Sequence, residues 1–241
     1  MQFSAAAISA ILAFTSLASA APRNSRRGAY PQELSLTAQL QLADTAVDRF
    51  ALLGDDEFVF DFNKAQENPG KGGELIVANR KLFPALVGTG SGMAFGRVDA
   101  CGMNTLHVHP RSAELQIVTS GRLITEMVPE NGVNDKDGNR RVIRTELGPN
   151  MMTPFYQGSV HTQFNPDCEP ATFVAAFASE DFGAGQIQDE TFALSDDVIA
   201  ATFGQSIAGE DIDRVRQAIP KTIALGVDAC LQKCGIHKRA I

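Results

Sequence analysis

The chain of 241 residues lacks the features that mark several common functional classes. Its net charge is −7, which argues against nucleic acid and anionic membranes as partners. Beyond residue 20, no apolar stretch is long enough to span a bilayer. The glycine-rich run GTGSG at 88–92 is not followed by the Lys-Ser/Thr pair of a phosphate-binding loop. With 44% hydrophobic residues, the composition is that of an ordinary globular protein.

Residues 1–20 contain no charged side chain and hold an apolar run over 5–17. The run ends in Ala18, Ser19 and Ala20, the small-x-small pattern that precedes signal-peptidase cleavage. A membrane anchor is the alternative, but the run is short for a bilayer. We therefore predict a signal peptide and a secreted, extracellular protein. In the basic segment 21–34, the pair Arg26-Arg27 marks either a second processing site or a flexible basic terminus.

Histidine is scarce, with four residues in the chain, and three of them belong to one pattern. His107 and His109 alternate in a strand-like segment, so both imidazoles point to the same face. Pro110 and the polar residues after it predict a turn that returns Glu114 toward them, and His161 lies further along the chain. Two histidines on a solvated strand would look the same, but imidazole and carboxylate together suit a first-row divalent metal ion. We predict that these four residues bind a metal.

The same segments resemble the two sequence motifs of the cupin superfamily. The first motif is matched by His107, His109, Glu114 and Gly121, with Cys101 in place of its usual leading glycine. The second motif, with two extra residues between Pro154 and Gly158, is matched by Gly148, Pro154, Gly158, His161 and Asn165. Within the superfamily, the run HVHPRSAE at 107–114 is similar to that of germins and spherulins.

The resemblance implies an all-β fold, a cupin jelly-roll β-barrel with flanking N- and C-terminal helices. It implies one domain over 35–220, a C-terminal helical tail over 221–241, and a homo-oligomer. The apolar spacing predicts a helix over 36–53 after the N-cap Ser35, strands from 57 to 177, and helices over 195–203 and 210–219. A last helix should end at Gly235.

As for function, the resemblance implies a bound Mn²⁺, although other divalent first-row metals suit the same ligands. Superoxide or a small carboxylate such as oxalate would use the open coordination positions, with Asn104 as a possible substrate contact. A second asparagine of oxalate oxidases is expected where this chain has Gly96. The predicted function is therefore a metal-dependent oxidoreductase, superoxide dismutase-like or oxalate-type. The alternative is a non-catalytic, metal-stabilised protein of wall, spore or cyst. A cupin sugar isomerase or dioxygenase fits a secreted chain less well.

The four cysteines are candidates for disulfides in a secreted protein. The resemblance makes the two motif strands antiparallel neighbours, and aligning His109 with His161 brings Cys101 near Cys168. We predict that disulfide. Cys230 and Cys234 either pair at a frayed helix end or simply pack, since a bridge across one helical turn is geometrically awkward.

Overall fold

The structure is a computed structural model that describes residues 34–64, 69–220, 223–226 and 228–237. The predicted signal peptide and the Arg26-Arg27 pair lie outside the described residues. One compact unit comprises Ser35–Ile241. No helix in the described ranges is long and apolar enough to cross a membrane.

The N-terminal region forms two short helices where the sequence predicted one over 36–53. α1 (Leu36–Leu42) begins after Ser35, whose side chain accepts a hydrogen bond from the Ala38 amide as predicted. α2 (Ala46–Ala51) begins at Thr45, where Thr45 and Asp48 form a capping box. This local cap offers the backbone an alternative to continuing the helix, which explains the break. Two short 3-10 helices follow, η1 (Asp55–Phe58) and η2 (Pro84–Leu86).

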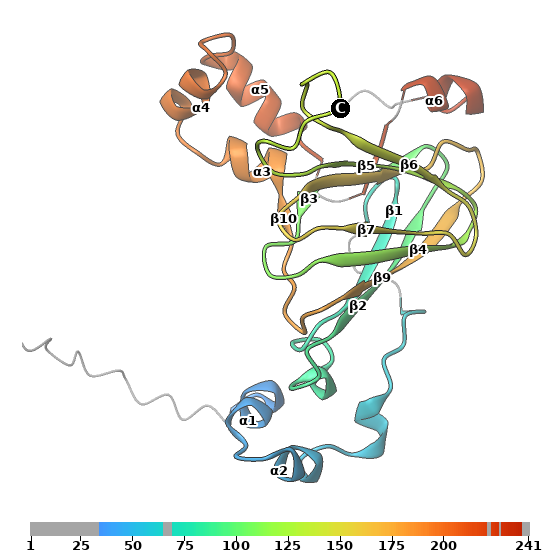
Figure 1. The fold of residues 1–241 in the computed structure, drawn as a ribbon, viewed down its shortest axis with the longest axis vertical. Helices are drawn as coiled ribbons and strands as arrows, with labels where there is room; N and C mark the ends of the chain where they lie inside the picture. Colours follow the sequence, from blue (N-terminus) through green and yellow to red (C-terminus); the bar gives the residue numbers. More distant parts are fainter. Residues whose placement is uncertain (1–33, 65–68, 221–222, 227, 238–241) are drawn as a thin grey trace, which may run out of the picture. The chain divides into compact units, whose positions relative to one another are not determined.

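Two antiparallel sheets form the body of the molecule (Figure 1). The five-stranded sheet has the order β1 (Gly73–Ala78), β2 (Gly92–Val98), β9 (Ala171–Phe177), β4 (Glu114–Ser120) and β7 (Met152–Phe155). The six-stranded sheet has the order β10 (Gly185–Gln186), β3 (Gly102–Val108), β8 (Val160–Phe164), β5 (Leu123–Val128) and β6 (Ile143–Leu147), with β11 (Ile223–Leu225) also paired to β3.

Alternate positions of the strands point inward and form the apolar core, because side chains change face at every residue of a strand. The core includes Val98, Val118, Leu123, Leu147 and Phe173, all nearly inaccessible to solvent. The predicted all-β jelly roll with flanking helices is confirmed. Its strands form two separate hydrogen-bonded sheets, a sandwich rather than a closed barrel, within the described residues.

Helices follow the last strands of the sandwich. α3 (Ile187–Phe192), α4 (Asp196–Thr202) and α5 (Glu210–Ala218) share a small core built around Ile199 and Ile212. The helices predicted over 195–203 and 210–219 correspond to α4 and α5. The tail contains β11 as well as α6 (Asp228–Cys234), which ends before Gly235 as predicted. The pairing of β11 with β3 has no signal in the local sequence.

The predicted disulfide between Cys101 and Cys168 is wrong. Cys101 bonds to Cys230 and Cys168 bonds to Cys234, with Cα atoms 5.5 and 5.4 Å apart. The prediction correctly placed β3 beside β8, but it set His109 opposite His161, whereas His107 is the residue paired with His161. Cys230 and Cys234 are four residues apart in α6, so they share one face of the helix and bridge to separate partners.

Candidate metal centre

Strands of both sheets bring the four predicted ligands together inside the sandwich. His107 is near the end of β3, His109 directly follows that strand, and His161 lies opposite His107 on β8. Glu114 is the first residue of β4, after the turn predicted at Pro110. All four residues are buried. The side chains of His109, Glu114 and His161 are 8%, 2% and 0% exposed. The sequence therefore predicted both the members of this cluster and the strand alternation that aims them inward.

The functional atoms of the four residues lie close enough to share one ion. The Nε2 atoms of His109 and His161 are 2.9 and 3.3 Å from Oε2 of Glu114. The imidazole centroids of His107 and His161 are 4.2 Å apart. One ligand atom from each residue can be chosen so that all four lie within 4.8 Å of one another, so the cluster could hold a metal ion.

The outer nitrogen of each imidazole contacts a backbone carbonyl. Nδ1 of His107 is 2.7 Å from the Thr105 oxygen, that of His109 is 2.6 Å from Gly183, and that of His161 is 2.9 Å from Ser159. Because a carbonyl oxygen only accepts, each Nδ1 must carry the hydrogen. In the neutral ring, Nε2 then presents a lone pair toward the centre, the arrangement found in metal-ligating histidines.

Charge and burial favour the ligand forms of these groups at neutral pH. Burial lowers the pKa of His107 from 6.5 to about 3, and His161 adds to the shift while Glu114 opposes it. Burial alone would raise the pKa of Glu114, but in the metal-free protein N–H donation from the His109 and His161 rings to the carboxylate outweighs burial and lowers the pKa to about 2. A bound ion would take the place of those protons. His107 is thus neutral and Glu114 anionic, as metal binding requires. Three inward lone pairs facing a carboxylate are stabilised by a cation between them.

Phenylalanine rings enclose the cluster and restrict the imidazoles. Phe155 stacks on His161 at 4.2 Å with an interplanar angle of 14°. Phe177 meets the edge of His109 at 4.7 Å and itself stacks on Phe182 at 3.7 Å. Such apolar walls limit solvent access and hold ligand rings in place. These residues were not predicted, because their approach depends on the packing of the two sheets.

Two buried amides near the cluster were also missed. Gln116 follows Glu114 by two residues on β4, and Gln163 follows His161 by two on β8, so each points inward like the ligand before it. Both side chains are buried, and their amide oxygen and nitrogen atoms have no hydrogen-bond partner among the described residues. Unpaired buried amides are rare and costly, which makes them candidates for binding a polar molecule. Their spacing of two from a ligand is the signal that could have revealed them.

The two positions expected to contact an oxalate-type substrate have different surroundings. Asn104 is buried on β3 and pairs with Gln163 of β8, next to a register shift that separates it from His107. Its contact with a substrate stays a prediction. Gly96 faces the interior, and a Cβ atom added there would collide with the ring of Phe173. The Phe173 ring therefore occupies the space that an asparagine side chain at position 96 would need.

Comparison with known proteins agrees with this fold. Residues 62–211 match the family model described as Cupin. The chain is 35% identical to spherulin-1A of Physarum polycephalum over 202 residues, which cover 83% of this chain and 79% of that protein. It is 32% identical to germin-like protein 12-2 of Oryza sativa subsp. japonica, covering 66% of this chain and 69% of that one. An oxalate oxidase solved with the substrate analogue glycolate superposes with a TM-score of 0.60 at 20% identity, covering 68% and 82% of the two chains. At that identity the likeness concerns the fold.

A jelly-roll sandwich with three histidines and one glutamate directed into it defines the class of the protein. The chain belongs to the cupin family, in its germin-like and spherulin-like branch.

Proposed function

We propose that the protein is a secreted, manganese-binding germin-like cupin that acts as a metal-dependent oxidoreductase on superoxide or a small carboxylate. His107, His109, Glu114 and His161 would hold the ion. The observation that carries the proposal is the set of three Nδ1 contacts to backbone carbonyls, which leave the Nε2 atom of each buried imidazole to serve as a ligand. Bound manganese would supply one-electron redox chemistry and open coordination positions for a small ligand.

The residues of the chain define what kind of ligand fits. Gln116 and Gln163 each offer amide N–H donors inside the sandwich, on the strands that carry Glu114 and His161. Such donors suit the oxygen atoms of a carboxylate or another small oxyanion. The rings of Phe155 and Phe177 lie against the histidines and would restrict the access of bulk water to a bound ion.

Two observations bear on whether oxalate is the substrate and whether the protein is an enzyme. Phe173 fills the space above Gly96, so this chain lacks half of the asparagine pair expected for oxalate. The two disulfides tie the C-terminal helix to the strand ends beside Cys101 and Cys168, as a protein selected for persistence would require. The second candidate function is therefore a non-catalytic, metal-stabilised protein of wall, spore or cyst.

Secretion is supported by residues 1–20 and by both disulfides. We also propose a homo-oligomer.

Metal analysis of the natively secreted protein tests the site. We expect about one manganese per chain, and we expect His107→Ala to lose it because the remaining ligands no longer enclose the ion. His237→Ala is the matched control, since His237 is exposed and lies outside the cluster. Loss of metal in both variants, or retention in both, would contradict the assignment of the ligands.

Activity assays on the metal-loaded protein then separate the two functions. Superoxide consumption, or hydrogen peroxide formation from oxalate, that disappears in His107→Ala supports the oxidoreductase. Stoichiometric metal with neither activity, together with a lower melting temperature of His107→Ala, supports the structural role.

A further inference from the structure

His109 depends on a distant part of the chain for its orientation, unlike the other two imidazoles of the cluster. Nδ1 of His107 and of His161 each contact the carbonyl oxygen of the residue two positions earlier. Nδ1 of His109 instead contacts the carbonyl oxygen of Gly183, 74 residues away, at 2.6 Å. Gly183 belongs to the loop of residues 178–184 between β9 and β10, which we call the β9–β10 loop. The position of this loop therefore determines the direction in which the His109 ring points.

Arg111 holds the β9–β10 loop through three hydrogen bonds. Its Nε donates to the backbone carbonyl of Asp181 at 2.7 Å, and its Nη2 donates to the Asp181 carboxylate at 2.9 Å. Its backbone N–H donates to the carbonyl of Phe182 at 3.3 Å. Because the guanidinium is planar and rigid, two donors to one residue fix the orientation of the loop as well as its distance. The residue that fixes the loop thus lies two positions after the histidine that the loop orients.

Donors from two other segments hold the same loop. The carboxylate of Glu180 accepts hydrogen bonds from the amides of Gly88 and Gly90, at 3.3 and 2.8 Å. These glycines belong to the run GTGSG, whose amides therefore bind a carboxylate of the chain itself. Arg80 donates from its guanidinium to Asp181 at 3.2 Å and from its backbone N–H to the Glu180 carbonyl at 2.9 Å. Both acidic side chains of the loop are therefore paired with donors outside it.

The β9–β10 loop also fits closely between Arg111 and the metal cluster. A Cβ atom at Gly183, whose φ is 65°, would lie 2.6 Å from Nη2 of Arg111, so glycine is what lets the backbone approach the guanidinium. Phe182 stacks on Phe177 at 3.7 Å, and its ring centroid is 5.8 Å from that of His109. The loop is thus in contact with the guanidinium on one side and with the ligand ring on the other.

The exposure of the ion pair decides what kind of role it can have. The side chains of Arg111 and Asp181 are 53% and 44% exposed, and such pairs contribute little to folding stability. A group that orients a metal-ligating imidazole, by contrast, affects the affinity of the metal site. We propose that Arg111 is a positioning residue, which places the Gly183 carbonyl so that His109 is directed at the metal ion. This inference rests on the proposed manganese site and identifies a residue outside the ligand set on which that site depends.

The first test uses the metal-free protein with 15N-labelled histidine. Arg111→Ala should shift the Nδ1–H NMR signal of His109 and speed its exchange with solvent, because the hydrogen bond to Gly183 loosens. The signals of His107 and His161 should keep their chemical shifts, since their acceptors are local. An unchanged His109 signal would overturn the proposal, and so would equal shifts of all three signals, which would indicate general loosening.

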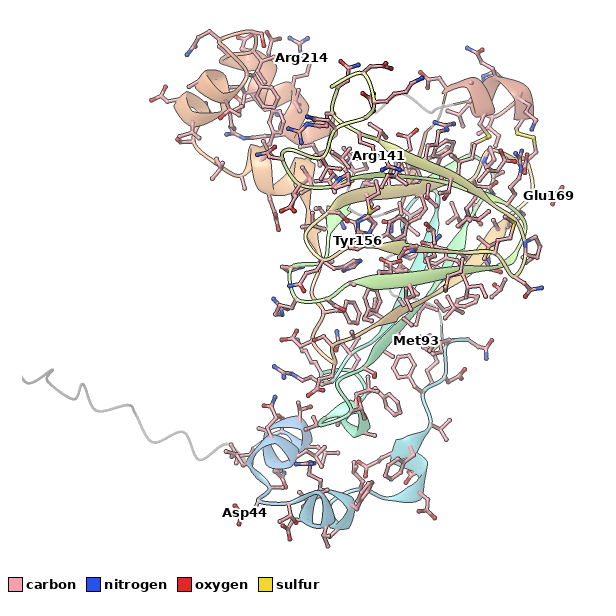
Figure 2. All side chains as sticks on the ribbon, in the orientation of Figure 1. Asp44, Met93, Arg141, Tyr156, Glu169 and Arg214 are labelled. Atoms are coloured by element: carbon pink, nitrogen blue, oxygen red, sulfur yellow. A yellow bond between two sulfur atoms is a disulfide. The ribbon has the colours of Figure 1, made fainter. Side chains whose placement is uncertain are left out.

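The second test measures the dissociation constant of Mn²⁺ from the natively secreted protein. Arg111→Ala should raise it roughly tenfold, as expected for residues that orient a ligand. Asp181→Asn should raise it less, because the Asp181 carbonyl still accepts from Nε. Arg111→Lys should also raise it less, because lysine keeps the charge without the planar fork. Arg214→Ala is the matched control and should leave the constant unchanged: Arg214 lies on α5 (Figure 2) and pairs with Asp211 at 2.8 Å.

Melting temperatures of the metal-free variants separate positioning from stability. We expect Arg111→Ala and Arg214→Ala to have similar melting temperatures without metal, and Arg111→Ala alone to bind Mn²⁺ more weakly. Equal manganese constants for the two variants would overturn the proposal. If Arg111→Ala does not fold, Arg111→Lys and Asp181→Asn take its place, and wild-type values of both the His109 signal and the manganese constant in both variants would overturn it. A wild-type protein that binds no manganese would overturn the proposed function, whereas the His109 signal of the metal-free protein decides the positioning by Arg111 in either case.

Discussion

At the scale of single residues, Cys101 shows why a family pattern can change without loss of the fold. The resembling motif has glycine at this position, and Cys101 adopts a positive φ of 56°, a backbone conformation that favours glycine. The Cys101 backbone is held on both sides, by its N–H to Asp167 and its carbonyl to Gly226, and its side chain bonds to Cys230. Tertiary contacts therefore maintain a conformation that the residue itself disfavours.

The pairing of Gly96 with Phe173 leads to a prediction about packing. Gly96→Ala should destabilise the protein by about 1–3 kcal/mol, since the new methyl group would collide with the Phe173 ring in a filled core. Gly148→Ala is the control, because a Cβ there meets its nearest atom at 3.7 Å, an ordinary contact. Urea denaturation measures both free energies of unfolding.

The double variant Gly96→Ala/Phe173→Leu locates the cause of that loss. It should recover part of the stability relative to the sum of the single changes, because leucine leaves space for the methyl group. Strictly additive effects would show that the Phe173 ring is not what position 96 meets.

At the scale of elements, the sequence predicted the strand alternation that aims His107 and His109 inward, and most of the helices. It did not predict the register of β3 against β8, which contains a shift between Asn104 and His107. The alternation of side chains between faces is a local property of one strand. The register depends on both strands, because at such an irregularity one strand contributes more residues than its partner. The position of α6 likewise depends on tertiary packing, which the local sequence does not specify. The disulfide partners depend on this position and on the register of β3 against β8, so the sequence did not predict them correctly.

Peptide mapping without reduction tests the disulfide pairs directly. Trypsin cleaves after Lys233 and so separates Cys230 from Cys234. We expect residues 98–111 linked to residues 222–233, and residues 145–214 linked to the short peptide from 234. A link between 98–111 and 145–214 would restore the Cys101–Cys168 pair and contradict the structure.

Removal of either bridge should loosen α6 from the strands. Replacing Cys101 and Cys230, or Cys168 and Cys234, with serine should cost about 2–5 kcal/mol of unfolding free energy. The bridges span sequence separations of 129 and 66 residues, so the first pair should cost at least as much. Urea denaturation of the two double variants checks both the size and the order. A loss below about 1 kcal/mol for both would show that α6 is held mainly by other contacts, such as those of Lys233 with Asp167.

At the scale of the whole molecule, the buried ligands couple stability to pH. In the native protein the pKa of His107 is lowered to about 3 and that of Glu114 to about 2, whereas the unfolded chain titrates them near 6.5 and 4.5. Between these values the unfolded state binds more protons than the native state, so the free energy of unfolding falls as the pH falls. The His107 contribution is complete above pH 6.5 and declines toward pH 3. That of Glu114 is complete above pH 4.5 and declines toward pH 2. The urea midpoint of the metal-free protein should therefore drop steadily from pH 7 to pH 4.

His107→Gln should flatten the upper part of that pH dependence, because glutamine does not titrate, whereas His237→Gln should leave it unchanged. Added manganese should raise the midpoint at pH 7 and lose its effect on acidification, since protons compete with the ion for the same imidazoles. A metal-free wild type whose midpoint is constant between pH 7 and pH 4 would show that His107 is not buried as a neutral imidazole. The metal effect, by contrast, tests the ligand set as a whole: if it persists in His107→Gln at full size, the ion binds elsewhere on the molecule.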